Sequence, residues 1–341
     1  MLYILSVYNF PTGGPETLHQ FAKHLMDYGV EVAMIYSDSA MLEAPDKFKI
    51  YNVPVVNKVI DSPENMLIVP ETLTRYLYKY KNIRKCIWWL SRDLYYGYNT
   101  LEGLLRCAQR QRIKKILLPV CIPLIYIKHK MVRPYFKFGK DKNKIFHMYN
   151  CEYVRTYLEQ HGVLAENMLY MCGPIRKEYF ECVPKEKEAL IAYNPKKNYD
   201  FTKKILRKLE NKRDDIKAVG IIGMKPEEIV DLLSRSSVYI DFGHFPGPER
   251  IPREAVTCYC NVITGMYGSA GNDVDVLVPK KYKFTASVKN IDKIICAIEE
   301  LVDNYNMHVD EFDHYRKKVK GQVELFEQNS REFVKLFHLS D

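Results

Sequence analysis

The first 36 residues constrain the fold of this chain more than any other segment. An apolar run at residues 2–7 is followed by a turn with two adjacent glycines, and residues 18–26 then place apolar side chains on one helix face. Gly29 stands where a helix end favours positive φ, and a second apolar run follows at residues 30–36. This order predicts a right-handed βαβ unit with parallel strands. Its glycine turn then lies at the carboxyl edge of the sheet, where such folds bind ligands.

The rest of the chain repeats these signals in two halves. In the first half we expect strands at residues 66–69, 86–90, 117–121 and 145–148 and a helix at 153–160. In the second half we expect strands at residues 190–193, 218–222, 238–242 and 261–264 and a helix at 226–236 that begins with a proline. Glycine and proline mark a crossing between the halves at residues 172–184, and residues 310–337 carry apolar side chains at helical spacing.

These patterns predict an α/β protein with two Rossmann-like, doubly wound domains that face a cleft. The expected boundaries are an N-terminal domain of residues 1–170, a C-terminal domain of residues 171–309 and a helical segment of residues 310–341 that packs back on the N-terminal domain. The length of 341 residues is too great for one average domain and fits two hydrophobic cores.

The charge and the cysteine content limit the classes of ligand and partner that we expect. A formal net charge of +9 suits nucleotide diphosphates, lipid-linked phosphates or an anionic membrane surface. No nucleic acid partner is expected, because the sequence has no zinc-finger, RNP or helix-turn-helix signature. The nine cysteines lack the paired spacing of a zinc site, so we expect reduced thiols in the core.

The apolar segments predict a cytoplasmic protein. The longest apolar stretch, residues 116–127, contains two prolines and falls short of the roughly 20 residues that a bilayer crossing requires. The first residues do not have the pattern of a secretory signal peptide. We therefore expect a cytoplasmic location, with peripheral association at the inner face of the plasma membrane.

Two short motifs follow expected strands and suggest contacts with an anion. Gly13 and Gly14 precede a helix whose free amides point at any anion bound there, and Glu16 stands in its first turn. The alternative is a turn that only reverses the chain, with Glu16 complementing the helix dipole. Lys196 and Lys197 follow the strand at residues 190–193 and are placed to neutralise a diphosphate leaving group, unless they form a solvated basic turn.

The densest motif is the segment of residues 241–255. Pro252 is expected to open a helix whose first turn holds Arg253 and Glu254. Glu254 is placed to accept hydrogen bonds from a ribose diol, while Arg250 and Arg253 face phosphates. The alternative is a surface loop with charge pairs.

A second glycine turn follows the next expected strand. Its residues Gly268, Ser269 and Ala270 are positioned to offer backbone amides to the same diphosphate.

These motifs together resemble GT-B glycosyltransferases of the retaining, E-x7-E type. They are similar in particular to a bacterial subgroup of surface-polysaccharide glycosyltransferases. The similar segments are residues 13–16, 87–91, 193–197, 239–243 and 250–255, and the likeness spans most of residues 1–290.

The resemblance implies a nucleotide-sugar donor, with UDP, GDP or dTDP as nucleotide, and a glycan or lipid-linked glycan acceptor. It implies hexosyl transfer without a cofactor or metal. Glu254 matches the second glutamate of the motif, but Pro246 occupies the position of the first. Glu249 is a nearby acid that we expect to compensate as a catalytic residue, although at a different spacing.

On the acceptor side, an inverting enzyme would need a general base from Glu16, Asp93 or His147. Two other readings stay open, namely a nucleotide-sugar epimerase or hydrolase of the same fold and an inactive nucleotide- or glycan-binding module.

Overall fold

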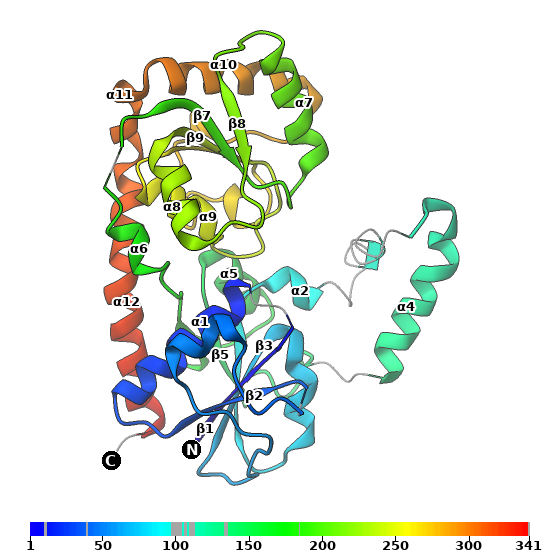
Figure 1. Ribbon diagram of the computed structural model, residues 1–341. Helices are drawn as coiled ribbons and strands as arrows, with labels where there is room; N and C mark the ends of the chain where they lie inside the picture. The colour runs from blue at the N-terminus through cyan, green and yellow to red at the C-terminus, as the bar shows by residue number, and fades with distance from the viewer. Residues whose placement is uncertain are drawn as a thin grey trace. The chain divides into compact units, whose positions relative to one another are not determined.

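The computed structural model describes residues 1–9, 12–38, 40–96, 104–105, 108, 113–132, 136–183 and 185–339. The chain divides into two units, the first formed by residues 1–173 and 326–341 and the second by residues 174–325. The expected boundary at residue 171 therefore lies three residues before this division. Figure 1 follows the chain through both units.

The first unit is built on a parallel sheet of six strands in the order β2-β1-β3-β4-β5-β6. The strands are β1 (Leu2–Ser6), β2 (Val32–Tyr36), β3 (Met66–Pro70), β4 (Arg84–Trp89), β5 (Phe146–Tyr149) and β6 (Met168–Tyr170). Its helices are α1 (Gly13–Asp27), α2 (Arg92–Tyr96), α4 (Leu118–Val132) and α5 (Glu152–Gln160). The predicted βαβ unit is confirmed, since β1 pairs in parallel with β2 and Gly29 has a φ of 79° beyond the end of α1.

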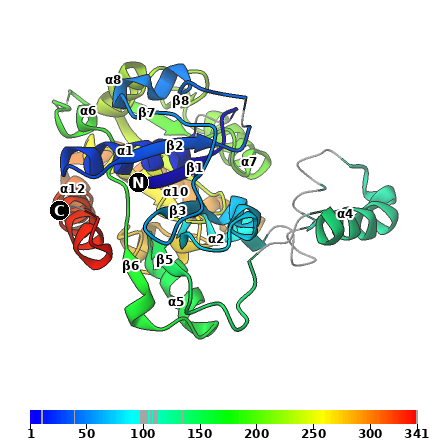
Figure 2. The ribbon, with the colours of Figure 1, turned by 90° about the horizontal axis from the view of Figure 1, so that it is seen from below.

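Alternate residues of β1 enter two different cores. Leu2 and Ile4 pack with apolar residues of α1, whereas Tyr3 and Leu5 pack with apolar residues of α5. Because successive strand residues point to opposite faces, α1 and α5 cover the two faces of this sheet. Figures 1 and 2 show both helices beside the strands.

One expected strand is wrong. Residues 117–121 were expected to be extended, but Lys115–Leu117 forms a 3-10 helix and α4 begins at Leu118. The run is apolar throughout, so its periodicity does not distinguish a strand from a helix. Pro119 lies in the first turn of α4, where a helix tolerates the missing amide.

The second unit is built on a parallel sheet of four strands in the order β10-β9-β7-β8. The strands are β7 (Glu188–Tyr193), β8 (Lys217–Gly220), β9 (Ser236–Asp241) and β10 (Asn261–Thr264). Its helices are α6 (Lys177–Phe180), α7 (Tyr199–Glu210), α8 (Pro226–Arg235), α9 (Arg250–Thr257), α10 (Ile291–Asp303) and α11 (Tyr305–His308). All four expected strands are present, and α8 begins at Pro226 as predicted.

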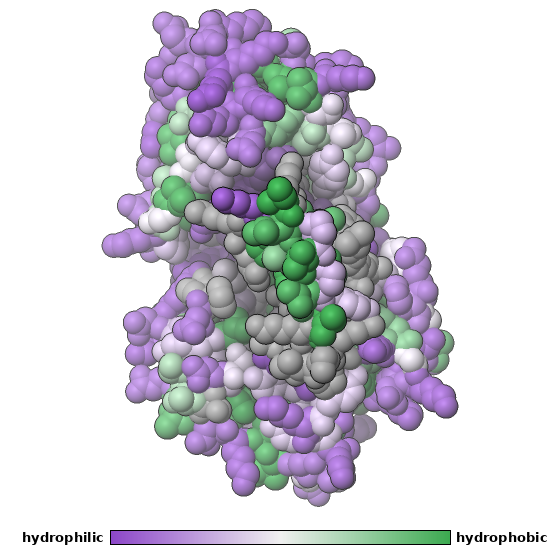
Figure 3. Space-filling view, turned by 90° about the vertical axis from the view of Figure 1, so that its right-hand side faces the viewer, coloured by the Kyte–Doolittle hydropathy of each residue, from purple (hydrophilic) through white to green (hydrophobic). Residues whose placement is uncertain are grey.

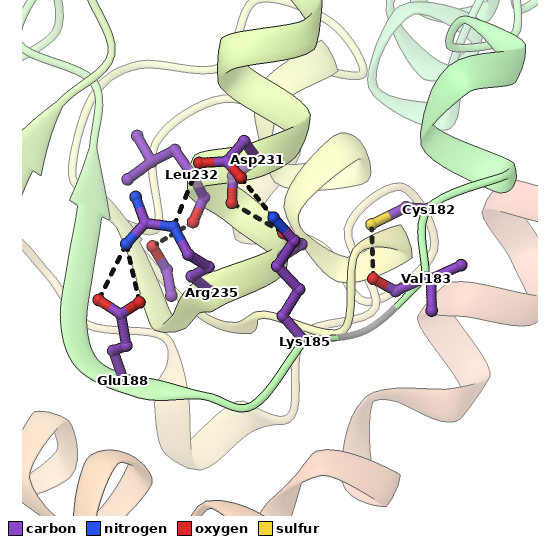
Figure 4. Close-up of polar contacts among 9 residues, drawn as sticks. Cys182, Val183, Lys185, Glu188, Asp231, Leu232 and Arg235 are labelled. Carbon is purple, nitrogen blue, oxygen red and sulfur yellow. Dashed lines mark hydrogen bonds and ion pairs between the residues drawn. The ribbon is translucent and has the colours of Figure 1, made fainter.

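The segment that leads into β7 is tied to α8 by charged side chains. Lys185 lies 2.6 Å from Asp231, and Arg235 contacts both Asp231 and Glu188. Figure 4 shows this group beside the thiol of Cys182. The ion pairs connect the start of β7 with the helix that precedes β9. Pro184, which ends the expected crossing at residues 172–184, lies outside the described residues.

The last long helix, α12 (Asp313–Phe337), contributes to both cores. Phe312, immediately before it, and its residues Tyr315 and Val319 lie in the core of the second unit. Phe326 and Phe333 lie in the core of the first unit beside Phe21 of α1, with ring centroids 6.1 and 5.4 Å from the Phe21 ring. The predicted helix at residues 310–337 is therefore confirmed, and its C-terminal part packs in the core of the first unit.

Truncating Phe333 should destabilise the first unit. Its side chain is fully buried, so Phe333→Ala is expected to lower the free energy of unfolding by about 3–5 kcal/mol. Leu336→Ala is the matched control on the same helix, because Leu336 is 50% exposed, and it should change stability by less than about 1 kcal/mol. Urea unfolding followed by circular dichroism measures both. Equal losses would contradict the assignment of this helix to the first core.

Candidate donor site

Three loops of the second unit leave the same edge of its sheet. β9 lies between β10 and β7, and all three strands are parallel, so the loops that follow them are neighbours. Most of the expected donor residues lie at this edge: Lys196 and Lys197 on the loop after β7, Arg250, Arg253 and Glu254 in α9, which follows the loop after β9, and Gly268, Ser269 and Ala270 after β10. Eight of the ten residues that the sequence predicts to bind the donor thus lie at one edge of the sheet.

The loops after β7 and β9 are joined by hydrogen bonds. The Asn198 side-chain amide donates to the Phe242 carbonyl at 3.1 Å, and Lys197 Nζ donates to the His244 carbonyl at 3.3 Å. A side chain at Gly243 would come within 2.4 Å of Lys197 Cβ. Glycine at this position therefore lets the two loops approach closely.

The loops after β9 and β10 are joined as well. The Ser269 amide donates to the Phe245 carbonyl at 2.8 Å, and its hydroxyl donates to the Gly247 carbonyl at 2.8 Å. Gly268 has a φ of 71°, and a Cβ there would lie 2.0 Å from the Phe245 oxygen. The Ser269 amide thus fastens one loop to the next, and its expected contact with a diphosphate stays a prediction. Ala270 is fully buried.

A buried carboxyl group stands at the end of β9. Asp241 accepts hydrogen bonds from the Gly243 amide at 2.8 Å and from the Tyr239 hydroxyl at 3.1 Å. Burial raises the pKa of Asp241 to about 6, although the nearby Lys197 ammonium opposes this shift. The strand pattern placed Asp241 at this edge, but sequence reasoning gave it no role.

Two ion pairs lie at the end of the loop after β9 and in the helix α9 that follows it. Glu249 Oε2 lies 2.7 Å from Lys197 Nζ, and both side chains are 23% exposed. Glu254 Oε1 lies 3.7 Å from Arg250 Nε, and Glu254 also forms a hydrogen bond with the Tyr179 hydroxyl. Glu249, an expected catalytic residue, and Glu254, an expected donor residue, are thus each held beside a cation. A polyanionic ligand could interact with these cations by exchanging partners with the carboxylates.

Arg253 is held inside the second unit. Its guanidinium donates to the Glu249 and Pro248 carbonyls at 3.2 Å each and to Gln322 Oε1 at 3.0 Å, and the residue is 4% exposed. This arrangement does not support the expectation that Arg253 faces phosphates. Arg253 instead fixes the loop to α12.

The helix after β9 begins earlier than expected. α9 starts at Arg250, so Pro252 is its third residue rather than its first. Proline is tolerated there because the first amides of a helix have no acceptor within the helix. As a result Arg250 lies at the start of the helix, where anionic ligands are favoured, and Arg253 and Glu254 follow in its second turn.

Two expected candidates of the first unit are paired with neighbours. Glu16 is 3% exposed, lies 3.5 Å from Lys47 Nζ, and accepts a hydrogen bond from the Tyr51 hydroxyl at 3.3 Å. Asp93 lies 3.0 Å from Arg92, whose guanidinium covers the ring of Tyr153. A carboxylate engaged with a cation is a weak general base, because the cation stabilises its charged form.

Gly13 and Gly14 are the first two residues of α1. Both belong to the first unit, and residues 10 and 11 of the expected glycine turn lie outside the described residues. Their expected contact with the donor stays a prediction.

His147 is a core residue of the first unit. Its ring is fully buried, its Nδ1 lies 3.0 Å from Trp89 Nε1, and its Nε2 lies 2.8 Å from the Lys142 carbonyl. Because the indole can only donate, Nδ1 accepts and Nε2 donates. Burial lowers the pKa of His147 to about 4. Both nitrogens are engaged, so the structure does not support His147 as a general base.

Sequence reasoning missed a buried carboxyl group at the end of β3. Glu71 is 2% exposed and accepts the Leu90 amide at 2.9 Å. Burial raises the pKa of Glu71 to about 7. Glu71 follows a strand at the same sheet edge as Asp93. This place after a strand is the one feature of the sequence that could have indicated a role for Glu71.

The fold matches solved glycosyltransferase structures. Sucrose-phosphate synthase from Thermosynechococcus elongatus is 11% identical, with a TM-score of 0.64 over 99% of both chains. WaaG, a glycosyltransferase involved in lipopolysaccharide biosynthesis, is 10% identical, with a TM-score of 0.61 over 99% of both chains. Anabaena HepE in complex with UDP-glucose is 10% identical, with a TM-score of 0.60 over 98% of this chain and 99% of that one.

A further match, TarM of S. aureus, has a TM-score of 0.52 and 12% identity, and the aligned region covers 56% of TarM. Neither a family model nor a curated protein sequence matches this chain. At these identities the likeness establishes the fold, which is the GT-B arrangement of two Rossmann-like domains.

The pKa of Asp241 predicts a pH-dependent stability difference. A folded-state pKa near 6, above the ordinary 3.8, means that the protonated carboxyl favours the folded state and that this contribution disappears as the pH rises through 6. The free energy of unfolding of the native protein, relative to Asp241→Asn, should therefore fall by about 2 kcal/mol from pH 4.5 to 7.5. Urea titrations at both pH values measure the difference. A constant difference would show that Asp241 titrates normally.

Proposed function

We propose that this chain is a glycosyltransferase that transfers a sugar from a nucleotide-sugar donor to a glycan or lipid-linked glycan acceptor. The pathway we propose is the synthesis of a bacterial surface polysaccharide of the capsule or lipopolysaccharide type. The observation that carries the proposal is the convergence of Lys197, Glu249, Arg250 and Glu254 on one carboxyl edge of the second sheet. Ligands of open α/β sheets bind at such an edge.

The GT-B fold supports a nucleotide-sugar as the donor. HepE, of the same fold, is described in complex with UDP-glucose, and TarM in complex with UDP. WaaG is described as acting in lipopolysaccharide biosynthesis. A lipid-linked acceptor would bring the enzyme to an anionic membrane surface, which the net charge of +9 also suits.

Each charged group is assigned one task. Glu254 accepts hydrogen bonds from the ribose diol, and Arg250 binds phosphate oxygens in exchange for its present partners. Lys197 neutralises the charge that grows on the diphosphate as the glycosidic bond breaks, and the exposed Lys196 assists it. Because these cations supply the positive charge, the reaction is proposed to need no metal.

The stereochemical course is proposed to be retention. Retaining transfer needs a well-placed acceptor and a stabilised diphosphate more than it needs a general base. Glu16 and Asp93 are paired with cations and His147 is hydrogen-bonded in the core, so this chain offers no strong general base among them. A retaining reaction agrees with this arrangement. Glu249 is proposed to contact the donor sugar in place of the glutamate that is absent at Pro246.

An alternative function rests on Pro246. A proline cannot provide the carboxylate that the E-x7-E pattern has at this position, so the chain could bind nucleotide sugars without transferring them, or could hydrolyse or epimerise them. Incubation with nucleotide sugars distinguishes these functions. Transfer requires acceptor-dependent release of the nucleoside diphosphate, hydrolysis releases it without acceptor, and a binding module releases none.

Neutralising Glu254 should weaken nucleotide binding. The amide of Glu254→Gln is a poorer acceptor for the ribose diol, so the dissociation constant of the nucleoside diphosphate should rise about tenfold or more. Glu210→Gln is the matched control, since Glu210 is an exposed residue of α7 in the same unit. Isothermal titration calorimetry measures both variants. Unchanged binding in Glu254→Gln would remove this residue from the donor site.

Truncating Lys197 should impair turnover more than binding. If its ammonium stabilises charge that develops in the transition state, Lys197→Ala should lower kcat by about tenfold to a hundredfold with a smaller change in donor affinity. Lys204→Ala, on the exposed side of α7, is the control. Steady-state transfer rates combined with calorimetry separate the two effects. A loss of affinity equal to the loss of kcat/KM would assign Lys197 to ground-state binding instead.

A further inference from the structure

The helix α4 exposes an unusual number of large apolar side chains. Val120 is 63% exposed, Leu124 60% and Ile127 49%, and Ile116 just before the helix is 84% exposed. Every residue of α4 whose burial is described is half-buried or exposed. Figure 3 shows a hydrophobic band on the face of the molecule where Figure 1 places α4.

The segment around α4 accounts for the net positive charge of the chain. Residues 103–140 contain ten lysines and arginines and no aspartate or glutamate. The remaining residues contain the other 41 basic residues and all 42 acidic ones, so their formal charge is close to zero. The ten basic residues flank the uncharged run at residues 116–127 on both sides. A partner of this segment must therefore be both apolar and anionic.

The length of the helix limits how it can meet a bilayer. Fifteen residues of α-helix extend about 22 Å, less than the roughly 30 Å of a hydrocarbon core. Among the described residues, no helix is long and apolar enough to cross a membrane. An apolar run of 10–14 residues is found in a protein core or at a membrane interface, and the exposure of α4 argues against the core.

We propose that residues 113–132 are a membrane-docking element that inserts its apolar side chains into the interface of an anionic bilayer while the flanking lysines contact lipid phosphates. Acyl chains accept the exposed aliphatic side chains, and each basic residue near an anionic surface adds attraction. A second copy of the chain fits this surface less well, because two segments of equal positive charge repel each other. The inference concerns docking alone and holds whether or not the chain transfers sugar.

Vesicle binding tests this element with the full chain. In a sedimentation assay, vesicles of phosphatidylcholine with about 30% phosphatidylglycerol should bind the protein. Vesicles of pure phosphatidylcholine should bind it at least about tenfold more weakly. The variant with Lys114, Lys115, Lys128 and Lys130 changed to Gln should lose about tenfold or more in affinity for the anionic vesicles. Its control, with Lys58, Lys81, Lys289 and Lys335 changed to Gln, removes the same charge from exposed residues elsewhere in the chain and should bind like the native protein.

A second pair of variants tests the apolar contribution. The triple change Val120→Ser, Leu124→Ser and Ile127→Ser should lower vesicle affinity at least about tenfold. The control changes Ile50, Ile60 and Val288, which are 69%, 61% and 66% exposed, to Ser. A cooperative thermal unfolding transition is required of each variant, as the check that it is folded. Equal binding by the two triple variants, or by the two lysine variants, would overturn the proposal.

Two further outcomes would also overturn it. One is the absence of binding to anionic vesicles by the native protein. The other is a native dimer that the α4 triple change converts to a monomer without affecting vesicle binding, which would identify a second copy as the occupant of this surface. Because no nucleotide sugar is present in these assays, their failure is distinct from a failure of the proposed transfer activity.

Discussion

Asp241 ends β9 inside the second unit, where its carboxyl group accepts the amide of Gly243 and the hydroxyl of Tyr239. These hydrogen bonds orient the start of the loop that carries Glu249 and leads into α9. The loop is then held from both sides, by Asn198 after β7 and by Ser269 after β10. Because buried polar groups are costly to leave without partners, this network holds the loop in one conformation. The charged side chains on it are consequently positioned before any ligand binds.

Much of the fold follows from local patterns in the sequence. Parallel strands buried on both faces appear as short apolar runs, which is why β1, β9 and β10 could be predicted. The short edge strand β6 was missed because three residues give no period to recognise. The strand expected at residues 117–121 was wrong because a continuous apolar run fits a buried strand and a helix equally well. Only its exposure in the structure shows that α4 is neither a core strand nor a core helix.

The candidate site was predictable in its location but not in the engagement of its side chains. Strand ends indicated that Lys197, Arg250 and Glu254 would share one sheet edge, because the carboxyl ends of parallel strands coincide. The sequence could not show that Arg253 turns inward to Gln322 or that the Ser269 amide fastens the neighbouring loop. Such contacts join residues that are far apart along the chain and depend on packing. The same holds for His147, whose partner Trp89 comes from another strand.

The central claim is that the carboxyl edge of the second sheet binds the nucleotide sugar. Amide hydrogen exchange of the full chain, with and without saturating UDP-, GDP- or dTDP-sugars, tests it most directly, because bound ligand protects the backbone it contacts. The account predicts slower exchange in residues 194–198, 241–254 and 265–271 with at least one of these donors, and little change at β8 of the same sheet. Protection confined to the first unit, or none with any donor at saturation, would contradict it.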